Sequence, residues 1–193
     1  MTKSLVQSGY LSPQIVADKA SQVAKDLEDL RRGPSLSALQ CGAALVTLGY
    51  ITRLEWLMLC ALDISPVPAE DLRSLVKCSD HVGIACVTGD LSTVLRSLQC
   101  RRLTIANTVL STADTQLLVA AMVTRVKKVT LDGDVTLDME TLAQYDGTGE
   151  CRAVVLAGPA TAEYGDQVKM WAENMGWFDD AFSEGSIIRI DRF

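Results

Sequence analysis

The chain has 193 residues, of which 48% are hydrophobic and 22% are charged, and its formal net charge is −6 at pH 7. These proportions are typical of a single globular domain and argue against disorder. The basic clusters, such as Arg101-Arg102 and Lys127-Lys128, are each only two residues long. Because binding of nucleic acid needs a basic face, we expect no nucleic-acid partner.

The chain shows neither a secretory signal after Met1 nor an apolar run of the ~18 residues that would span a bilayer. The sequence therefore predicts no membrane partner and a cytoplasmic location. Its six cysteines include no C-x-x-C pair, and in that location they are expected to be reduced thiols. Cys60, Cys86 and Cys100 have apolar neighbours in the sequence and are expected to behave as small hydrophobes.

The first 50 residues predict a helical N-terminal cap. Residues 1–11 are polar, and Ser12-Pro13 begins a helix with a good N-cap followed by proline. Apolar residues at helical spacing continue this helix to Arg32, before Gly33-Pro34 ends it. A second helix is predicted from Ser35 or Ser37 to Leu48.

Between Leu54 and Leu156 one short pattern recurs. Alternating apolar residues are followed by a polar or glycine-containing break and then by an apolar helical stretch. Strands are predicted at 54–59, 82–87, 103–105, 126–131 and 152–156, with helices at 69–76, 91–98, 112–124 and 138–145 between them. Taking Leu57, Ile84, Leu103, Val129 and Val154 as equivalent gives steps of 27, 19, 26 and 25 residues. Such a period indicates a solenoid with one strand and one helix per unit.

After Gly158-Pro159 the pattern changes. Residues 161–175 predict one longer helix, and residues 187–190 predict a last strand. We interpret residues 159–193 as a mixed C-terminal cap in which Trp171 and Trp177 are buried.

The stretch from Cys100 to Thr124 resembles the leucine-rich repeat family, in its ribonuclease-inhibitor-like class. It has an L-x-L core in Leu103 and Ile105, then Asn107, and then a leucine at 110. The next two repeats carry glycine at the asparagine position. The resemblance implies an α/β solenoid over residues 51–158, with parallel strands, helices on the convex side and both caps in one structural domain. It also implies protein–protein interaction without catalysis, in a fragment or relative of a cytosolic innate-immune-type sensor.

Residues that could carry chemistry form no convincing site. Gly147-Thr148-Gly149 precedes a strand, whereas a nucleotide-binding loop follows one. His81, the sole histidine, is interpreted as a turn residue or the first residue of a strand. Asp132, Asp134 and Asp138 are interpreted as turn and helix-capping residues. We therefore expect no catalytic residue, no cofactor and no metal.

Side chains that alternate with the core are predicted to line the open surface of the sheet. Tryptophan is enriched in binding hot spots, so Trp56 is a candidate anchor, with burial against the N-terminal helices as the alternative. The predicted partner is another protein with an acidic patch. An alternative function is a compact α/β protein whose doubly wound sheet binds a small ligand. The candidate surface consists of Trp56, Met58, Arg102, Thr104, Lys128 and Thr130, with Glu55 and Val155 as further members.

Overall fold

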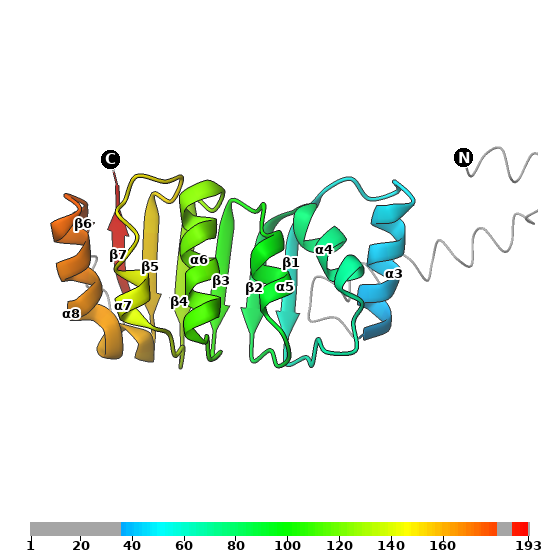
Figure 1. The fold of residues 1–193 in the computed structure, drawn as a ribbon, viewed down its shortest axis with the longest axis horizontal. Coiled ribbons are helices and arrows are strands. Elements are labelled where there is room, and N and C mark those ends of the chain that lie inside the picture. The colour runs from blue at the N-terminus through cyan, green and yellow to red at the C-terminus, as the bar shows by residue number, and fades with distance from the viewer. Residues whose placement is uncertain (1–35, 181–186, 193) are drawn as a thin grey trace, which may run out of the picture.

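The computed structural model of the chain describes residues 36–180 and 187–192 (Figure 1). The polar start and the helix predicted up to Arg32 lie outside the described residues. The described helices are α3 (Leu36–Thr47), α4 (Ala69–Lys77), α5 (Ser92–Ser97), α6 (Thr112–Thr124), α7 (Met139–Leu142) and α8 (Pro159–Asn174). The strands are β1 (Leu54–Cys60), β2 (Ser79–Ala85), β3 (Arg102–Ala106), β4 (Lys128–Asp132), β5 (Ala153–Ala157), β6 (Phe178–Asp180) and β7 (Ile187–Asp191). The predicted α/β class is confirmed.

One seven-stranded sheet has the order β1-β2-β3-β4-β5-β7-β6. The first five strands are parallel and follow chain order, whereas β7 and β6 add antiparallel. Successive helices from α3 to α7 touch one another, and Figure 1 shows the helices on one side of the sheet. A doubly wound sheet reverses its strand order and carries helices on both faces. The described residues do neither.

The register corrects one predicted repeat position. Leu57 pairs with Val82, and Val82 pairs with Leu103, so Val82 rather than Ile84 is equivalent to Leu57. From Leu57 through Val82, Leu103 and Val129 to Val154, the steps are 25, 21, 26 and 25 residues. An error of two residues leaves each side chain on the same face, and Ile84 is accordingly still buried.

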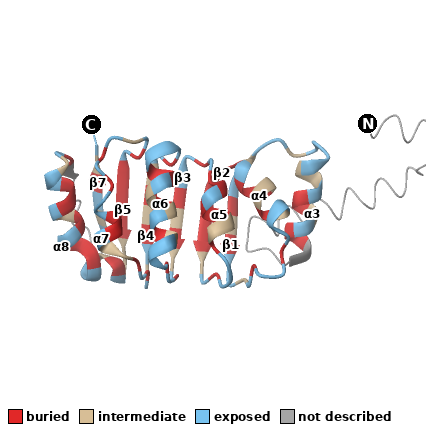
Figure 2. Cartoon of the chain, viewed as in Figure 1, coloured by how far each residue is buried: buried red, intermediate tan, exposed pale blue. Residues whose placement is uncertain are grey.

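The core lies between the sheet and the helices, and Figure 2 shows buried positions in both the strands and the helices. Leu103 and Ile105 are 1% and 0% exposed, as predicted. On the helix side the core is completed by residues such as Leu75 from α4 and Leu118 from α6. Alternation along the strands thus places one row of side chains in the core and leaves the next on the other face.

Several element boundaries differ from their predictions by one to three residues, and β2, β4 and α7 are the clearest cases. β2 begins at Ser79 instead of Val82 because Ser79 and His81 already pair with β1. β4 begins at Lys128, since the Val126 amide donates to the Ala121 carbonyl and closes the end of α6. α7 is a single turn, shorter than predicted.

A left-handed backbone position follows each parallel strand. The five residues there have φ between 45° and 64°, although three of them are not glycine. Four of their amides donate to the carbonyl of the last paired residue of the next strand. The feature shared by the repeats is therefore a positive φ at this position rather than an asparagine. The five residues are Ala61, Cys86, Asn107, Gly133 and Gly158.

An aromatic cluster fills the core beside α8. Trp171 and Trp177 are both buried, as predicted, and their ring centroids lie 5.9 Å apart. The Trp171 indole nitrogen donates to the Tyr145 carbonyl at 3.0 Å. The Tyr145 hydroxyl in turn donates to the Cys151 carbonyl at 3.2 Å. These bonds fasten α8 to the loop that leads into β5.

Candidate functional site

The candidate site lies on the sheet face that is opposite the described helices, which we call the open face. The pairing of β1 to β5 arranges its side chains in two rows. All six main residues of the predicted candidate surface fall in these two rows, so the strand register brings them together. The first row is Trp56, His81, Arg102, Lys128 and Ala153, and the second is Met58, Gly83, Thr104, Thr130 and Val155.

Trp56 stacks on His81 at one end of the first row. Their ring centroids are 4.1 Å apart and their planes differ by 29°. Trp56 remains 44% exposed, and the first of the two predicted N-terminal helices lies outside the described residues. His81 beneath it is only 8% exposed. A large aromatic surface is thus held in a fixed position while staying accessible.

Met58 and Gly83 occupy the start of the second row. A β-carbon on Gly83 would stand 2.5 Å from the Met58 sulfur and 3.6 Å from the Trp56 indole nitrogen. The absence of a side chain at Gly83 therefore lets Met58 lie across the neighbouring strand. Met58 extends the apolar surface that begins at Trp56.

The imidazole of His81 is linked to the second row through one nitrogen only. Its Nε2 lies 2.9 Å from the Thr104 hydroxyl oxygen, whereas its buried Nδ1 has no hydrogen-bond partner among the described residues. Burial lowers the pKa of His81 from 6.5, and the charges of Arg102 and Lys128 lower it further. The ring is therefore neutral at pH 7. Sequence reasoning gave His81 no role, because only the register reveals its contact with Trp56.

Arg102 and Lys128 make the middle of the first row cationic. They are paired across β3 and β4, and neither forms a side-chain ion pair with a described residue. Arg102 is exposed and Lys128 is half-buried. Two like charges side by side, in a protein of net charge −6, give this part of the open face a positive potential.

The prediction is wrong for the two further residues that it placed on the open surface of the sheet. Val155 lies in the second row, but it is only 8% exposed. Glu55 alternates with Trp56 and so falls on the side of Leu57, although it is exposed near the start of β1. The usable surface therefore lies over β1 to β4.

The prediction that three cysteines behave as small hydrophobes is right for one of them and wrong for two. Cys100 is buried, as expected of a small hydrophobe, but Cys60 and Cys86 are exposed. Cys60 ends β1 with the same alternation as Trp56, and Cys86 occupies the left-handed position after β2. Their apolar neighbours in the sequence turn toward the core instead.

Asp138 is a helix cap, as predicted. Its carboxylate accepts from the Thr141 amide at 3.1 Å and from the Thr112 hydroxyl at 3.0 Å. It thus joins α7 to the start of α6. Within the described ranges, no group of three His, Cys, Asp or Glu residues is placed to hold a metal ion. Of the described helices, none is long and apolar enough to cross a membrane.

Comparison with known proteins assigns no family to the chain. No protein-family model, curated protein or solved structure matches it. The resemblance to leucine-rich repeats consequently stays a proposal, and function has to be argued from the open face itself.

Proposed function

We propose that this chain is a short leucine-rich-repeat-like solenoid that binds another protein and catalyses no reaction. Five parallel strands in chain order support this proposal, as do helices on one side and the left-handed position after each strand. On this proposal residues 51–158 form the solenoid and residues 1–50 and 159–193 form its caps. The chain then works in the cytoplasm, as a fragment or relative of a cytosolic immune sensor.

The observation that carries the proposed function is the accessible tryptophan on the open face. Trp56 is 44% exposed yet held by its stacking on His81. A rigid aromatic side chain loses little conformational entropy on binding, which is why tryptophan dominates many interfaces. Trp56 and Met58 therefore form the apolar centre of the proposed interface, and the cations border it.

The partner that fits this surface is a protein segment with an apolar side chain and adjacent carboxylates. The apolar group would cover Trp56, and the carboxylates would meet Arg102 and Lys128, whose charges have no ion-pair partner among the described residues. Charge pairs of this kind mainly raise the association rate and fix the orientation of the partner. Binding should therefore weaken as the salt concentration rises.

The surroundings of His81 support a non-catalytic role. Its 2.9 Å contact with the Thr104 hydroxyl has the spacing of a nucleophile and its base. In such a pair, however, a third group orients the base, and Nδ1 of His81 has no described partner. The lowered pKa also makes the imidazole a weaker base. We infer that the contact holds the two rows together.

Capture experiments with matched variants test this function. Arg102→Glu with Lys128→Glu, and separately Trp56→Ala, should reduce capture of the partner from cell lysate several-fold, with an unchanged melting temperature. Lys77→Glu with Arg96→Glu is the control, because it reverses two exposed charges on the helix side. If both open-face variants fold and still capture the partner as well as the wild type, the interface does not lie on the open face.

A further inference from the structure

A second polar surface lies on the helix side of the molecule, where a cavity of about 430 Å³ opens beside α4 and α5. Four of its lining side chains are cationic and one, Asp90, is acidic. The rest are serine, threonine and glutamine. The lining therefore carries a formal excess of three positive charges in a protein of net charge −6. We call it the cationic pocket, and its cations are Arg73, Lys77, Arg96 and Arg125.

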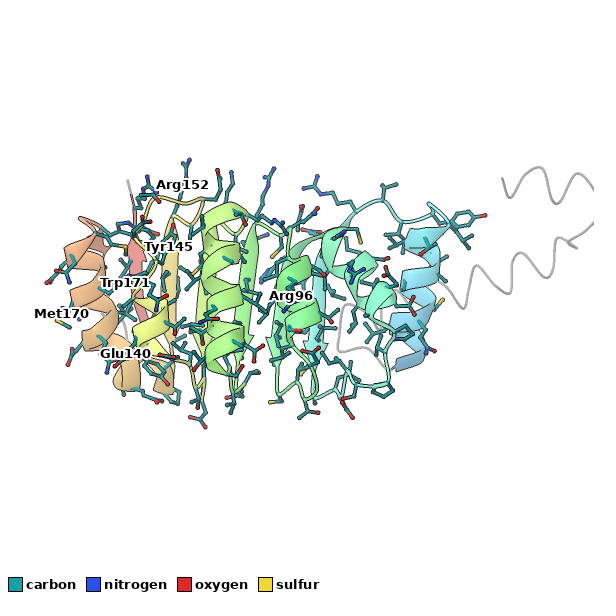
Figure 3. The ribbon with its side chains drawn as sticks, viewed as in Figure 1. Arg96, Glu140, Tyr145, Arg152, Met170 and Trp171 are labelled. Atoms are coloured by element: carbon teal, nitrogen blue, oxygen red, sulfur yellow. The ribbon has the colours of Figure 1, made fainter. Side chains whose placement is uncertain are left out.

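The four cations come from three helices. Arg73 and Lys77 are four residues apart on α4 and so lie on one side of that helix. Arg96 belongs to α5, on the side of the molecule that faces the viewer in Figure 3. Arg125 directly follows α6. Helix α5 touches both α4 and α6, and this packing brings together residues from 73 to 125.

Two of the four cations have bonding partners among the described residues, and the other two have none. A guanidinium nitrogen of Arg125 donates to the Leu98 carbonyl at 2.9 Å, and Arg73 forms an exposed ion pair with Glu70. The exposed side chains of Lys77 and Arg96 form no hydrogen bond or ion pair with a described residue.

The acidic member, Asp90, does not neutralise the pocket. Its carboxylate already accepts from the Ser92 amide at 2.9 Å. The bonds from Ser92 lower the pKa of Asp90, with a smaller contribution from the charge of Arg96. With Glu70 paired to Arg73, two carboxylates offset four cations, and the remaining excess positive charge stays available to an anion.

We propose that the cationic pocket binds a small polyphosphate, a molecule with at least two phosphate groups. Guanidinium groups match phosphate oxygens in paired hydrogen bonds, and hydroxyl and amide donors such as Ser92 and Gln99 supplement them. Four cations from α4, α5 and the residue after α6 favour a ligand that carries more than one phosphate. No aromatic or apolar side chain is part of the lining. The pocket therefore offers no aromatic platform for a base, and a nucleotide should gain little from its base.

Calorimetry on the full chain tests the proposal with pyrophosphate, tripolyphosphate, ATP, orthophosphate and sulfate. Pyrophosphate should bind at one site, at least tenfold more tightly than orthophosphate or sulfate, and ATP should bind no more tightly than tripolyphosphate. The affinity should fall between 50 and 200 mM NaCl. If ATP bound tenfold more tightly than tripolyphosphate, the pocket would be a nucleotide site, and the polyphosphate proposal would be wrong.

Variants then locate the binding. Arg96→Gln and Lys77→Gln should each weaken pyrophosphate about tenfold, while the melting temperature without ligand stays the same. Arg102→Gln with Lys128→Gln, which removes two cations from the open face, should leave the affinity unchanged. The proposal is overturned by pyrophosphate binding no more tightly than sulfate, or by both pocket variants keeping full affinity. Because the two surfaces have separate variants, failure here leaves the proposed protein interface untouched.

Discussion

The side-chain oxygen of Asn107 occupies the space that a β-carbon on Gly133 would need. The same oxygen accepts a hydrogen bond from the Asp134 amide at 3.0 Å. Asn107 and Gly133 hold the same position in successive repeats, since each follows one residue of the Ala106–Asp132 pair. An asparagine in one repeat thus excludes a side chain from the equivalent position of the next.

Two substitutions separate the hydrogen bond of Asn107 from its backbone conformation. Its φ is 45°, which glycine adopts freely and alanine does not. Asn107→Gly should lose only the hydrogen bond, about 1 kcal/mol of unfolding free energy. Asn107→Ala should lose the bond and add left-handed strain of about 1–2 kcal/mol. Urea denaturation measures both, and equal losses would contradict the assigned strain.

A double-mutant cycle tests the contact between Asn107 and Gly133. Gly133→Ala introduces a clash with Asn107 as well as strain at φ 64°. In the Asn107→Gly background the clash disappears and only the strain remains. The loss of unfolding free energy should therefore be at least about 1 kcal/mol smaller in that background, as for residues in direct contact. Additive losses would show that the two side-chain positions do not compete.

Leu103→Ala should lower the unfolding free energy by about 2–5 kcal/mol, because Leu103 is buried in the centre of the core. Arg102→Ala is the control, since Arg102 is exposed on the other face, and it should change stability by no more than about 0.5 kcal/mol. Chemical denaturation of both variants gives the comparison. A loss below about 1 kcal/mol for Leu103→Ala would place the strand out of register by one residue.

Local patterns were sufficient to predict most of the elements. Strand alternation identified Leu103 and Ile105 as core. Helix α6 covers the predicted 112–124, and Ser111 forms its N-cap through a reciprocal bond with Asp114. The register of β2 did not follow from the same pattern. Val82 and Ile84 are both apolar and share a face, so alternation fits either alignment with β1.

The functional surfaces depended on information that local patterns lack. Trp56 and His81 are 25 residues apart in the sequence, and their stacking exists only in the correct β1–β2 register. Arg102 and Lys128 were placed correctly because their strands have the clearest alternation. The cationic pocket could not be predicted, because helix packing alone joins Lys77 to Arg125.

Gly149→Ala should destabilise the protein through a backbone clash. A β-carbon on Gly149 would stand 2.7 Å from the Val123 carbonyl oxygen, and the adjacent Glu150 amide donates to that same carbonyl at 3.0 Å. A backbone contact relaxes less readily than a side chain, so the loss should be about 1–3 kcal/mol. The exposed neighbour supplies the control, Glu150→Ala, which should stay within about 0.5 kcal/mol. Similar melting temperatures for the two variants would disprove the close approach.

The thiols should differ in reactivity. Burial raises the pKa of both Cys100 and Cys151 to about 11, so the thiolate that reacts with iodoacetamide is scarce near pH 8. Cys60 and Cys86 are exposed. Mass spectrometry of a time course should show these two alkylated first and the buried pair only on unfolding. Six alkylated thiols are expected after denaturation without reductant, and fewer would reveal a disulfide.

The last prediction concerns the protonation of His81. Its pKa is lowered chiefly by burial and then by Arg102 and Lys128, so Arg102→Gln with Lys128→Gln should raise it toward 6.5. The chain has a single histidine, and its imidazole NMR signals give the titration without overlap. An unchanged pKa in the double variant would mean that the two cations lie farther from the ring than the register places them.

The same lowered pKa sets how stability depends on pH. As the pH falls below about 6.5, the unfolded chain takes up a proton on His81 before the folded protein does. The unfolding free energy should therefore be constant above that pH and should decrease below it, levelling off once the folded pKa is passed. His81→Gln, measured between pH 7 and pH 5 by urea denaturation, should abolish this part of the decrease. A wild-type protein that gains stability over this interval relative to His81→Gln would mean that the folded state favours the imidazolium, against the burial and the neighbouring cations that lower the pKa of His81.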